Sequence, residues 1–223
     1  ALSGVTADAE FAPVPFTKLY QRALYQSMRT LTRKVFKTLS QQAETLPAGT
    51  LQELPPLPGM EKEILARFKA VPERKLSGMR IRCHGDYHLG QVLHTGKDFV
   101  IIDFEGEPAR PISERRIKRS PLKDVAGMLR SFHYAAHSVL FSQETAGLSR
   151  SEDAAYLDSW AIFWYFWVGS AFLGAYIEHA SPGGFLPKSG EELSLLLEAY
   201  LLEKSVYELG YELNNRPEWA RIP

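Results

Sequence analysis

Five polar residues bracket one short segment of the sequence that has the pattern of a β-hairpin. His84, Asp86 and Gln91 precede its first strand, and Asp103 and Glu105 follow its second strand. The segment "QVLHTGKDFVIIDF" has apolar, β-branched runs on either side of "HTGKD", which predicts a hairpin that turns there. Because the ends of a hairpin meet at its open end, we expect Gln91 and Asp103 to lie close together. Asp103 follows "FVII", which predicts that it is held at the end of a buried strand.

These side chains offer hard oxygen donors, namely carboxylates and one amide. Mg²⁺ prefers such oxygens in proteins, together with water molecules and the phosphate oxygens of a substrate. Asp86 lies five residues before Gln91, so it can face an incoming hydroxyl group instead of the metal. An Asp that accepts the nucleophile's proton, with an amide and a second Asp that hold Mg²⁺ on a nucleotide, is the arrangement of phosphoryl transfer.

The same stretch resembles a known family motif. "HGDYHLGQ" followed by "IIDFEG" resembles the H-x-D-x-x-x-x-N and D-x-E/D pair of the aminoglycoside-phosphotransferase-like branch of the protein-kinase superfold. Gln91 stands where Asn is usual, and in this respect the chain resembles the maltokinases. A maltokinase module is found fused behind trehalose synthase. The resemblance extends from "LYQRALYQSMR" to "YELNNRPEW", which is nearly the whole chain.

The resemblance implies roles for the residues around the hairpin. Asp86 would be the catalytic base, and Gln91 and Asp103 would be Mg²⁺ ligands. Glu105 would be an auxiliary acid at the same metal site. ATP and Mg²⁺ are therefore the expected cofactors.

The resemblance also implies supporting and acceptor-binding residues. His84 would brace the catalytic loop, and Asp124, in "SPLKDVAGML", would anchor that loop from the start of a helix. Near the carboxyl end, Glu208, Arg216 and Tyr211 would contact the sugar acceptor. The helical face that carries Tyr211 is explained equally well by ordinary packing of a core and its rim, and both interpretations stay open.

The activity that the resemblance implies is ATP-dependent phosphorylation of maltose at its reducing-end hydroxyl, which gives maltose 1-phosphate. A kinase of this type needs an amino-terminal lobe with a glycine-rich loop and a lysine for the triphosphate. No such loop precedes Asp86, so we expect this chain to be a C-terminal lobe that binds ATP weakly or not at all. The ATP lobe and a trehalose synthase domain would be its partners in the same polypeptide.

Three other functions compete with this interpretation. One is a catalytically silent kinase-like lobe that docks trehalose synthase, and another is a phosphotransferase for a different sugar or small molecule. The third is a metallophosphoesterase, because "GDYHLG" loosely matches a signature of that class. Two-metal hydrolases need several further His and Asp ligands on other strand ends, and this chain does not obviously provide them.

The elements that position these residues are mostly helical. Apolar residues recur at three-to-four spacing in long runs, which indicates helices around one small hairpin and a fold class of mainly α (α+β), the C-lobe of a protein-kinase-like fold. We expect a helical segment over residues 1–79 and a catalytic and acceptor-binding part over 80–223, within a single domain. The predicted helices cover about 16–46, 60–71, 122–141, 152–178 and 190–214, with a short strand in "MRIRCHG" and a charged loop at 105–121.

Composition excludes several classes of protein. The 223 residues are 45% hydrophobic and 23% charged, which is ordinary for a globular domain, and 26 basic residues balance 26 acidic ones. A net charge of zero gives no support for a nucleic-acid partner or an anionic membrane surface. The only cysteine, Cys83, allows no intramolecular disulfide, and one free thiol fits a cytoplasmic protein.

Residues 159–177 form an uncharged stretch long enough to raise the question of a membrane span. Its aromatic residues crowd the middle of the stretch, and its flanks have no Lys/Arg bias. Trp160, Trp164 and Trp167 fall on one helical face. We therefore expect a buried core helix and no membrane.

Isolated histidines in a soluble domain are most often structural. We expect that role for His88, His94, His133 and His137. The pair His133 and His137 has the spacing of two zinc ligands on one helix, but no third ligand is evident in the sequence.

Overall fold

The computed structural model describes residues 8–43, 46, 57–107, 111–145 and 153–223. It divides into two compact units, Ala1–Val14 with Met79–Leu186 and Pro15–Gly78 with Pro187–Pro223. The chain thus returns to the first unit near the boundary expected at residue 79. The division into parts 1–79 and 80–223 stays a prediction.

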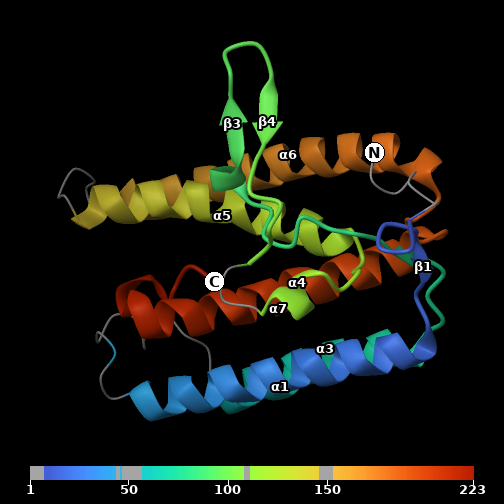
Figure 1. The fold of residues 1–223 in the computed structure, drawn as a ribbon. Helices are drawn as coiled ribbons and strands as arrows, with labels where there is room; N and C mark the ends of the chain where they lie inside the picture. Colours follow the sequence, from blue (N-terminus) through green and yellow to red (C-terminus); the bar gives the residue numbers. More distant parts are fainter. Residues whose placement is uncertain (1–7, 44–45, 47–56, 108–110, 146–152) are drawn as a thin grey trace. The chain divides into compact units, whose positions relative to one another are not determined.

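The first unit is built on two long helices, α5 (Leu122–Thr145) and α6 (Ala154–Ala180), which pack against each other (Figure 1). Its hairpin consists of the antiparallel strands β3 (Val92–His94) and β4 (Phe99–Ile101). In the register of the hairpin, Val92 pairs with Ile101 and His94 pairs with Phe99. Helices around one small hairpin were predicted, and the mainly α (α+β) fold class is confirmed.

The hairpin turn forms where the sequence predicts it. Thr95 donates its backbone N–H to the carbonyl of Asp98, and its hydroxyl accepts the N–H of Asp98, which closes the turn. Gly96 has a φ of 89°, a left-handed conformation that glycine adopts without steric penalty. The turn therefore fixes the register that places Gln91 and Ile102 next to each other at the open end.

The prediction that Asp103 follows a buried strand is wrong. Phe99, Val100 and Ile101 of β4 are 67%, 46% and 40% exposed. Figure 1 shows the reason, because the hairpin projects away from α5 and α6, and those helices cover only its base. An apolar run of strand residues indicates that the strand prefers burial, but not which element covers it.

The first unit also contains short elements that the sequence pattern does not predict. One is the helical turn α4 within the predicted charged loop, and an isolated bridge joins Ile81 to Arg119. These elements are too short to show a periodic pattern. They are α4 (Ile112–Arg115) and the 3₁₀ turns η3 (Leu89–Gln91) and η5 (Ser181–Gly183). The short strand predicted in "MRIRCHG" is present as β2 (Met79–Arg80). Strand β1 (Val14–Pro15) lies at the boundary between the two units.

Helix α6 has the predicted position but not the predicted burial. Trp160, Trp164 and Trp167 are 52%, 43% and 71% exposed, so the expectation of a buried core helix is wrong. The helix is apolar around its whole circumference, and a sequence of that kind does not reveal which side packs. Only one side meets α5, where the ring of Trp164 lies edge-on to Phe132.

Within the described part of the chain, Ala155–Gly183 is long and apolar enough to cross a membrane by length and composition, with a mean hydropathy of 1.3. Only 11% of the most apolar 18-residue stretch of this helix is buried. A single stretch of this kind also occurs as the core helix of soluble proteins. It does not by itself indicate a membrane protein.

A pair of histidines lies between α5 and α6. The rings of His133 and His137 are 4.3 Å apart, and Tyr165 of α6 lies edge-on to His133 at 5.3 Å. Burial, the positive charge of Arg130 and the neighbouring His137 together lower the pKa of His133 to about 3, and burial has the largest effect. His133 is therefore neutral at neutral pH. In the described residues, no cluster of three His, Cys, Asp or Glu side chains could hold a metal.

The lowered pKa predicts a pH dependence of stability. The unfolded chain binds a proton at His133 near pH 6.5, whereas the folded chain resists it until about pH 3. The neutral ring thus contributes stability that is present above pH 6.5 and is lost as the pH falls toward 3. We expect the free energy of unfolding of wild type to fall more steeply over that range than that of His133→Gln, measured by urea unfolding. Parallel pH profiles would contradict this assignment.

The second unit is a three-helix packing of α1 (Lys18–Gln42), α3 (Leu57–Glu73) and α7 (Gly190–Asn215), followed by the turn η6 (Pro217–Trp219). All three helices lie where the sequence predicts them. Buried residues of α1 recur at the spacing of one helical face. They are Gln21, Leu24, Met28, Thr32, Val35, Phe36 and Leu39.

The only glutamine on that face, Gln21, is buried because it satisfies the end of α3. Its side-chain amide donates to the backbone carbonyls of Val71 and Arg74, each at 2.7 Å. The ammonium group of Lys18 also donates to the carbonyl of Arg74, at 2.8 Å. The carbonyl of Val71 lies in the last turn of α3 and that of Arg74 directly follows the helix, where backbone carbonyls have no partner within the helix. The contacts tie α1 to the end of α3.

Candidate active site

The loop that carries Asp86 is fixed to the start of α5 by one carboxylate. Asp124, in the first turn of α5, accepts the backbone N–H of His84 at 2.7 Å and that of Gly85 at 3.0 Å. A carboxylate that accepts two backbone N–H groups makes charge-assisted hydrogen bonds, which are short and directional. The geometry matches the bracing role that the family resemblance implies for Asp124.

Burial raises the pKa of Asp124 above its usual range, and its two backbone hydrogen bonds oppose that shift. For a carboxyl group with a raised folded-state pKa, the associated stability is complete below the unfolded value and is lost as the pH rises through the folded value. Ionisation of Asp124 therefore lowers the stability of the folded chain. Such a loss of stability is expected for a residue whose role is to hold the catalytic loop in place.

Asp124→Asn is expected to weaken the contact that holds the loop to α5. An amide keeps one acceptor oxygen but turns its NH₂ group toward the second backbone N–H, so we expect roughly tenfold or greater loss of activity in the full-length protein. Because the variant has no carboxylate to bury, its stability relative to wild type should improve between pH 4 and pH 7. Kinetics and urea unfolding at both pH values test this. A stability difference that does not change with pH would contradict it.

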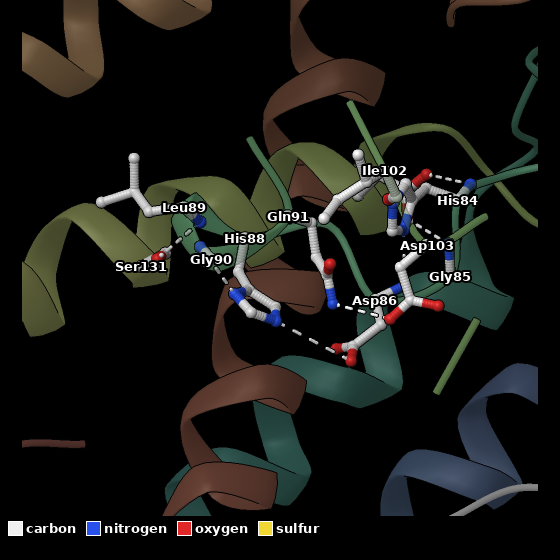
Figure 2. A network of polar contacts seen from close by, with 11 residues as sticks. His84, Gly85, Asp86, His88, Leu89, Gly90, Gln91, Ile102, Asp103 and Ser131 are labelled. Carbon is white, nitrogen blue, oxygen red and sulfur yellow. Dashed lines mark hydrogen bonds and ion pairs between the residues drawn. The ribbon is translucent and has the colours of Figure 1, made fainter. Parts of the chain in front are cut away.

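His84 joins the same loop to the end of the hairpin. Its backbone is held by Asp124, its Nδ1 lies 3.3 Å from the N–H of Asp86, and its Nε2 lies 2.7 Å from the carbonyl oxygen of Ile102 (Figure 2). If Nδ1 accepts from Asp86, the proton is on Nε2 and is donated to Ile102. The buried imidazole therefore connects the backbone of Asp86 with the residue before Asp103.

Three glycines allow the backbones of the site to approach one another. Gly85 and Gly106 have φ values of 90° and 79°, and a Cβ on Gly85 would lie 3.4 Å from Cα of Gly106. A Cβ on Gly127 of α5 would lie 2.7 Å from the carbonyl oxygen of Tyr87. Glycine is thus required where the catalytic loop meets both the loop after β4 and the helix that supports it.

Gln91 and Asp103 meet at the open end of the hairpin. The N–H of Ile102 donates to the carbonyl of Gln91 at 3.0 Å, which continues the ladder by one residue beyond the strands. The side-chain amide of Gln91 then lies 3.0 Å from Oδ2 of Asp103. The predicted proximity of these two side chains is confirmed. Their role as metal ligands stays a proposal.

Asp103 has a φ of 61° and is the non-glycine residue with a left-handed backbone among the described residues. Asp and Asn adopt this conformation more readily than most side chains, but it is still uncommon. Such positions are concentrated at functional sites, where the surrounding structure holds them in place. The conformation turns the chain sharply at the end of β4, and Figure 2 shows the carboxylate of Asp103 facing Gln91 and Asp86.

The donor set at this corner fits Mg²⁺. The amide oxygen of Gln91 and the carboxylate of Asp103 are hard oxygen ligands on adjacent backbone segments, and the amide needs only a flip to present its oxygen. Glu105 lies two residues after Asp103 and is exposed. A site of a few protein oxygens, completed by water and phosphate oxygens, is the usual way in which Mg²⁺ is bound beside nucleotides.

Asp86 is partly covered and faces the same corner. Its side chain is 22% exposed, and Figure 2 shows its carboxylate opposite Gln91 and Asp103. Oδ2 of Asp86 also lies 3.9 Å from Nε2 of His88, a residue that the sequence indicated only as structural. The corner thus gathers Asp86, His88, Gln91 and Asp103 from one loop and one hairpin.

An apolar cavity of 840 Å³ lies behind the loop, within the first unit. Its walls include Phe104, Phe172, Cys83 and Tyr176. Burial raises the pKa of the Cys83 thiol and of the Tyr176 phenol far above their usual ranges. Both groups are therefore protonated and unreactive at neutral pH, and Cys83 is not a nucleophile. The same dry surroundings explain the raised pKa of Asp124, which also lines the cavity.

The predicted acceptor-binding residues lie in the second unit, at the end of α7. Glu208 and Tyr211 are on the helix, and Arg216 follows its last turn. The structure therefore groups Asp86, Gln91, Asp103, His84 and Asp124 within one unit and these three residues within the other. Their contact with an acceptor stays a prediction.

The structure assigns Arg216 a partner that the sequence analysis missed. Glu212 is almost fully buried, and its carboxylate accepts Nε and Nη2 of Arg216 at 2.8 and 2.7 Å. The guanidinium group also lies over Trp219, 4.4 Å from the ring centre. The Glu-to-Arg spacing of four residues on a helix is a signal that could have identified this pair. Arg216 is therefore held rigidly, and its Cζ also lies 5.8 Å from the ring centre of Tyr211.

Comparison with known proteins finds similarity to phosphotransferases over part of the chain. A model of the phosphotransferase enzyme family matches residues 21–106, which include Asp86, Gln91 and Asp103. A glucosamine kinase of Mycolicibacterium smegmatis is 31% identical over 141 residues, which are 63% of this chain and 32% of that protein. A glucosamine kinase of Streptacidiphilus jiangxiensis is 34% identical over 61 residues, or 27% of this chain and 14% of that protein.

Solved structures agree in fold over almost the whole chain. A glucosamine kinase in complex with glucosamine, ADP and inorganic phosphate superposes with a TM-score of 0.73 at 21% identity, over 95% of this chain and 47% of that chain. A second crystal form of glucosamine kinase gives a TM-score of 0.72. This chain has the fold of that part of a glucosamine kinase. It spans about half the length of the solved relative and 32% of the length of the Mycolicibacterium smegmatis protein.

Proposed function

We propose that this chain is the catalytic, acceptor-side lobe of a kinase that transfers the γ-phosphoryl group of ATP to a hydroxyl group of a sugar. The observation that carries the proposal is the corner at the base of the hairpin. There the Gln91 amide is bonded to the Asp103 carboxylate, and Asp86 faces both from a braced loop. The phosphotransferase family match over residues 21–106 gives independent support.

In the proposed reaction, Asp86 orients the sugar hydroxyl and accepts its proton. The hydroxyl oxygen forms a bond to the γ-phosphorus while the bond between that phosphorus and the β–γ bridging oxygen breaks, and ADP leaves. Gln91 and Asp103 hold Mg²⁺ in this proposal, with Glu105 as an auxiliary acid. Bound Mg²⁺ would neutralise the charge of the phosphate oxygens. His84 and Asp124 keep the loop, and so the base, at a fixed position.

We propose maltose as the acceptor and its reducing-end hydroxyl as the nucleophile, which makes the product maltose 1-phosphate. This rests on the resemblance of "HGDYHLGQ", with Gln91 in place of Asn, to maltokinases. Tyr211, Arg216 and Glu208 would form the acceptor surface, with Arg216 held rigid by Glu212. The ATP lobe, and a trehalose synthase domain, are proposed as neighbours in the same polypeptide.

Glucosamine is the second candidate acceptor, because two curated relatives and the solved neighbours are named glucosamine kinase. The two sugars differ in charge, since glucosamine carries an ammonium group and maltose carries none. A site for glucosamine would need a carboxylate at its 2-position, whereas a site for maltose needs donors and acceptors for neutral hydroxyl groups.

A panel of sugars separates these proposals. The full-length protein is incubated with ATP and Mg²⁺ and with maltose, glucosamine, glucose or trehalose, and kcat/KM is measured from ADP formation. We expect maltose to give the highest kcat/KM. A preference for glucosamine would contradict the acceptor and leave the phosphotransferase proposal intact. No transfer to any sugar by a folded protein that binds ATP would favour the silent scaffold.

A further inference from the structure

The side chain of His88 is held in one orientation by the backbone of the turn that it begins. The residue caps the 3₁₀ turn η3, and its Nδ1 accepts the backbone N–H of Gly90 at 3.1 Å. The ring lies so close to Gly90 that a Cβ there would be 2.8 Å from Cε1 and 3.0 Å from Nδ1. The N–H of Leu89 in the same turn donates to the hydroxyl of Ser131 on α5, at 3.0 Å. The imidazole is therefore seated on a turn that α5 anchors.

The cap decides which ring nitrogen of His88 carries the proton. A nitrogen that accepts an N–H must be unprotonated, so the neutral ring has its proton on Nε2. Nε2 points at Asp86, where the distance to Oδ2 is 3.9 Å (Figure 2). This is longer than a hydrogen bond. Contacts of catalytic groups are often long without substrate and shorten when it binds.

His84 repeats the arrangement within the same loop. Its Nδ1 also lies near the N–H of the residue two positions on, Asp86, and its Nε2 meets the carbonyl of Ile102. One histidine thus positions the backbone of Asp86 and the other faces its side chain. Two imidazoles with the same tautomer, set four residues apart, thus face one residue, His84 at the backbone of Asp86 and His88 at its carboxylate.

We propose that His88 is a positioning residue, whose Nε2–H faces the carboxylate of Asp86 and holds it in the rotamer that accepts the proton of the sugar hydroxyl. This inference rests on the proposed function for its catalytic consequence. Its geometric content, a donor imidazole aimed at Asp86, is independent of the acceptor. It goes beyond the structural role that the sequence indicated for His88.

Two substitutions separate this role from simple capping. In His88→Asn, the side-chain oxygen takes the place of Nδ1, so the cap of η3 is kept and the donor to Asp86 is lost. In His88→Gln, the amide nitrogen takes the place of Nε2, so the donor is kept and the cap is lost. Ser131→Ala loosens the same turn without changing the ring and shows how much activity depends on the turn alone.

On the full-length protein we expect His88→Asn to lower kcat by about tenfold to a hundredfold, the usual effect of a misplaced reacting group, with little change in the KM of the sugar. His88→Gln should keep more of the wild-type kcat while it lowers the melting temperature more than His88→Asn does. If His88 acted only as a cap, His88→Asn would keep more of the wild-type kcat than His88→Gln does. That result would overturn the inference. In an Asp86→Asn background, removal of the imidazole should have little further effect on kcat.

Nuclear magnetic resonance tests the geometry without reference to catalysis. The ¹⁵N shifts of the His88 ring should show a protonated Nε2 and an unprotonated Nδ1, and Asp86→Asn should shift the Nε2–H resonance. An Nδ1-protonated ring, or an Nε2–H signal unaffected by Asp86→Asn, would overturn the inference whether or not the protein is active. A wild-type protein that transfers no phosphate but has the expected ring signals would overturn only the proposed function.

Discussion

Asp86→Asn is expected to lower the rate of phosphoryl transfer by roughly 10²–10⁴-fold, the usual contribution of a positioned general base. Asn has the shape of Asp but accepts a proton poorly. The backbone of residue 86 keeps its contact with Nδ1 of His84, so the loop should stay in place. The KM values for ATP and sugar should change little, because the lost interaction belongs to the transition state.

Asp98→Asn is the matched control for this prediction. It removes the same charge from the same part of the chain, but Asp98 lies in the turn at the far end of the hairpin. Initial rates of ADP formation and thermal unfolding of both variants are measured on the full-length protein. A folded Asp86→Asn variant with a wild-type rate would remove Asp86 from the mechanism. A loss of rate in both variants would show that charge, and not the base, is responsible.

Asp103→Asn is expected to lower kcat by about 10²-fold or more and to raise the Mg²⁺ concentration needed for half-maximal rate. The reason is the loss of the charged ligand from the proposed metal site. Asn tolerates the left-handed backbone that Asp103 adopts, with a φ of 61°, so the substitution changes charge without adding strain. Ala at this position would mix both effects and is a poorer test.

Gln91→Asn and Gln91→Leu complete this test. Asn keeps the amide oxygen and shortens the side chain by one methylene, so we expect partial activity. Leu removes the oxygen from a side chain of similar size, and we expect a loss comparable to that of Asp103→Asn. Rates titrated with Mg²⁺ report all three variants. A Gln91→Leu variant with the Mg²⁺ dependence of wild type would exclude Gln91 as a ligand.

The long elements and the corner of the site could be predicted because both depend on local patterns. Apolar spacing locates α1, whose buried residues recur on one face, and the apolar runs of α5 and α7 also predict helices where the structure has them. The proximity of Gln91 and Asp103 follows from the position of the hairpin turn, because each further pair of the ladder is set by the one before it. Asp124 was reached differently, through the family resemblance.

The incorrect predictions concern burial, which depends on neighbouring elements that no local sequence pattern specifies. Helix α6 is apolar on all sides, so its sequence does not distinguish a covered face from an exposed one, and Trp167 is 71% exposed. The strand β4 has the composition of a buried strand, yet it projects from its unit. In both, the residue types predicted the element correctly and its surroundings incorrectly.

The small contacts of the site were missed for another reason. His88 caps a turn of three residues, and histidine is an unusual cap with no sequence signature. The requirement for glycine at position 127 comes from the carbonyl of Tyr87, which is 40 positions earlier in the chain. Such contacts arise only when distant segments are brought together in three dimensions.

The most direct measurement of the central claim follows the γ-phosphoryl group itself. The full-length protein is incubated with [γ-³²P]ATP, Mg²⁺ and maltose, and the labelled products are separated. The proposed site predicts that the label moves to a sugar monophosphate, that chelation of Mg²⁺ stops the transfer, and that Asp86→Asn nearly abolishes it. Label that appears only as inorganic phosphate, or that stays in ATP with every sugar tested, would contradict the claim that this corner performs phosphoryl transfer to a sugar.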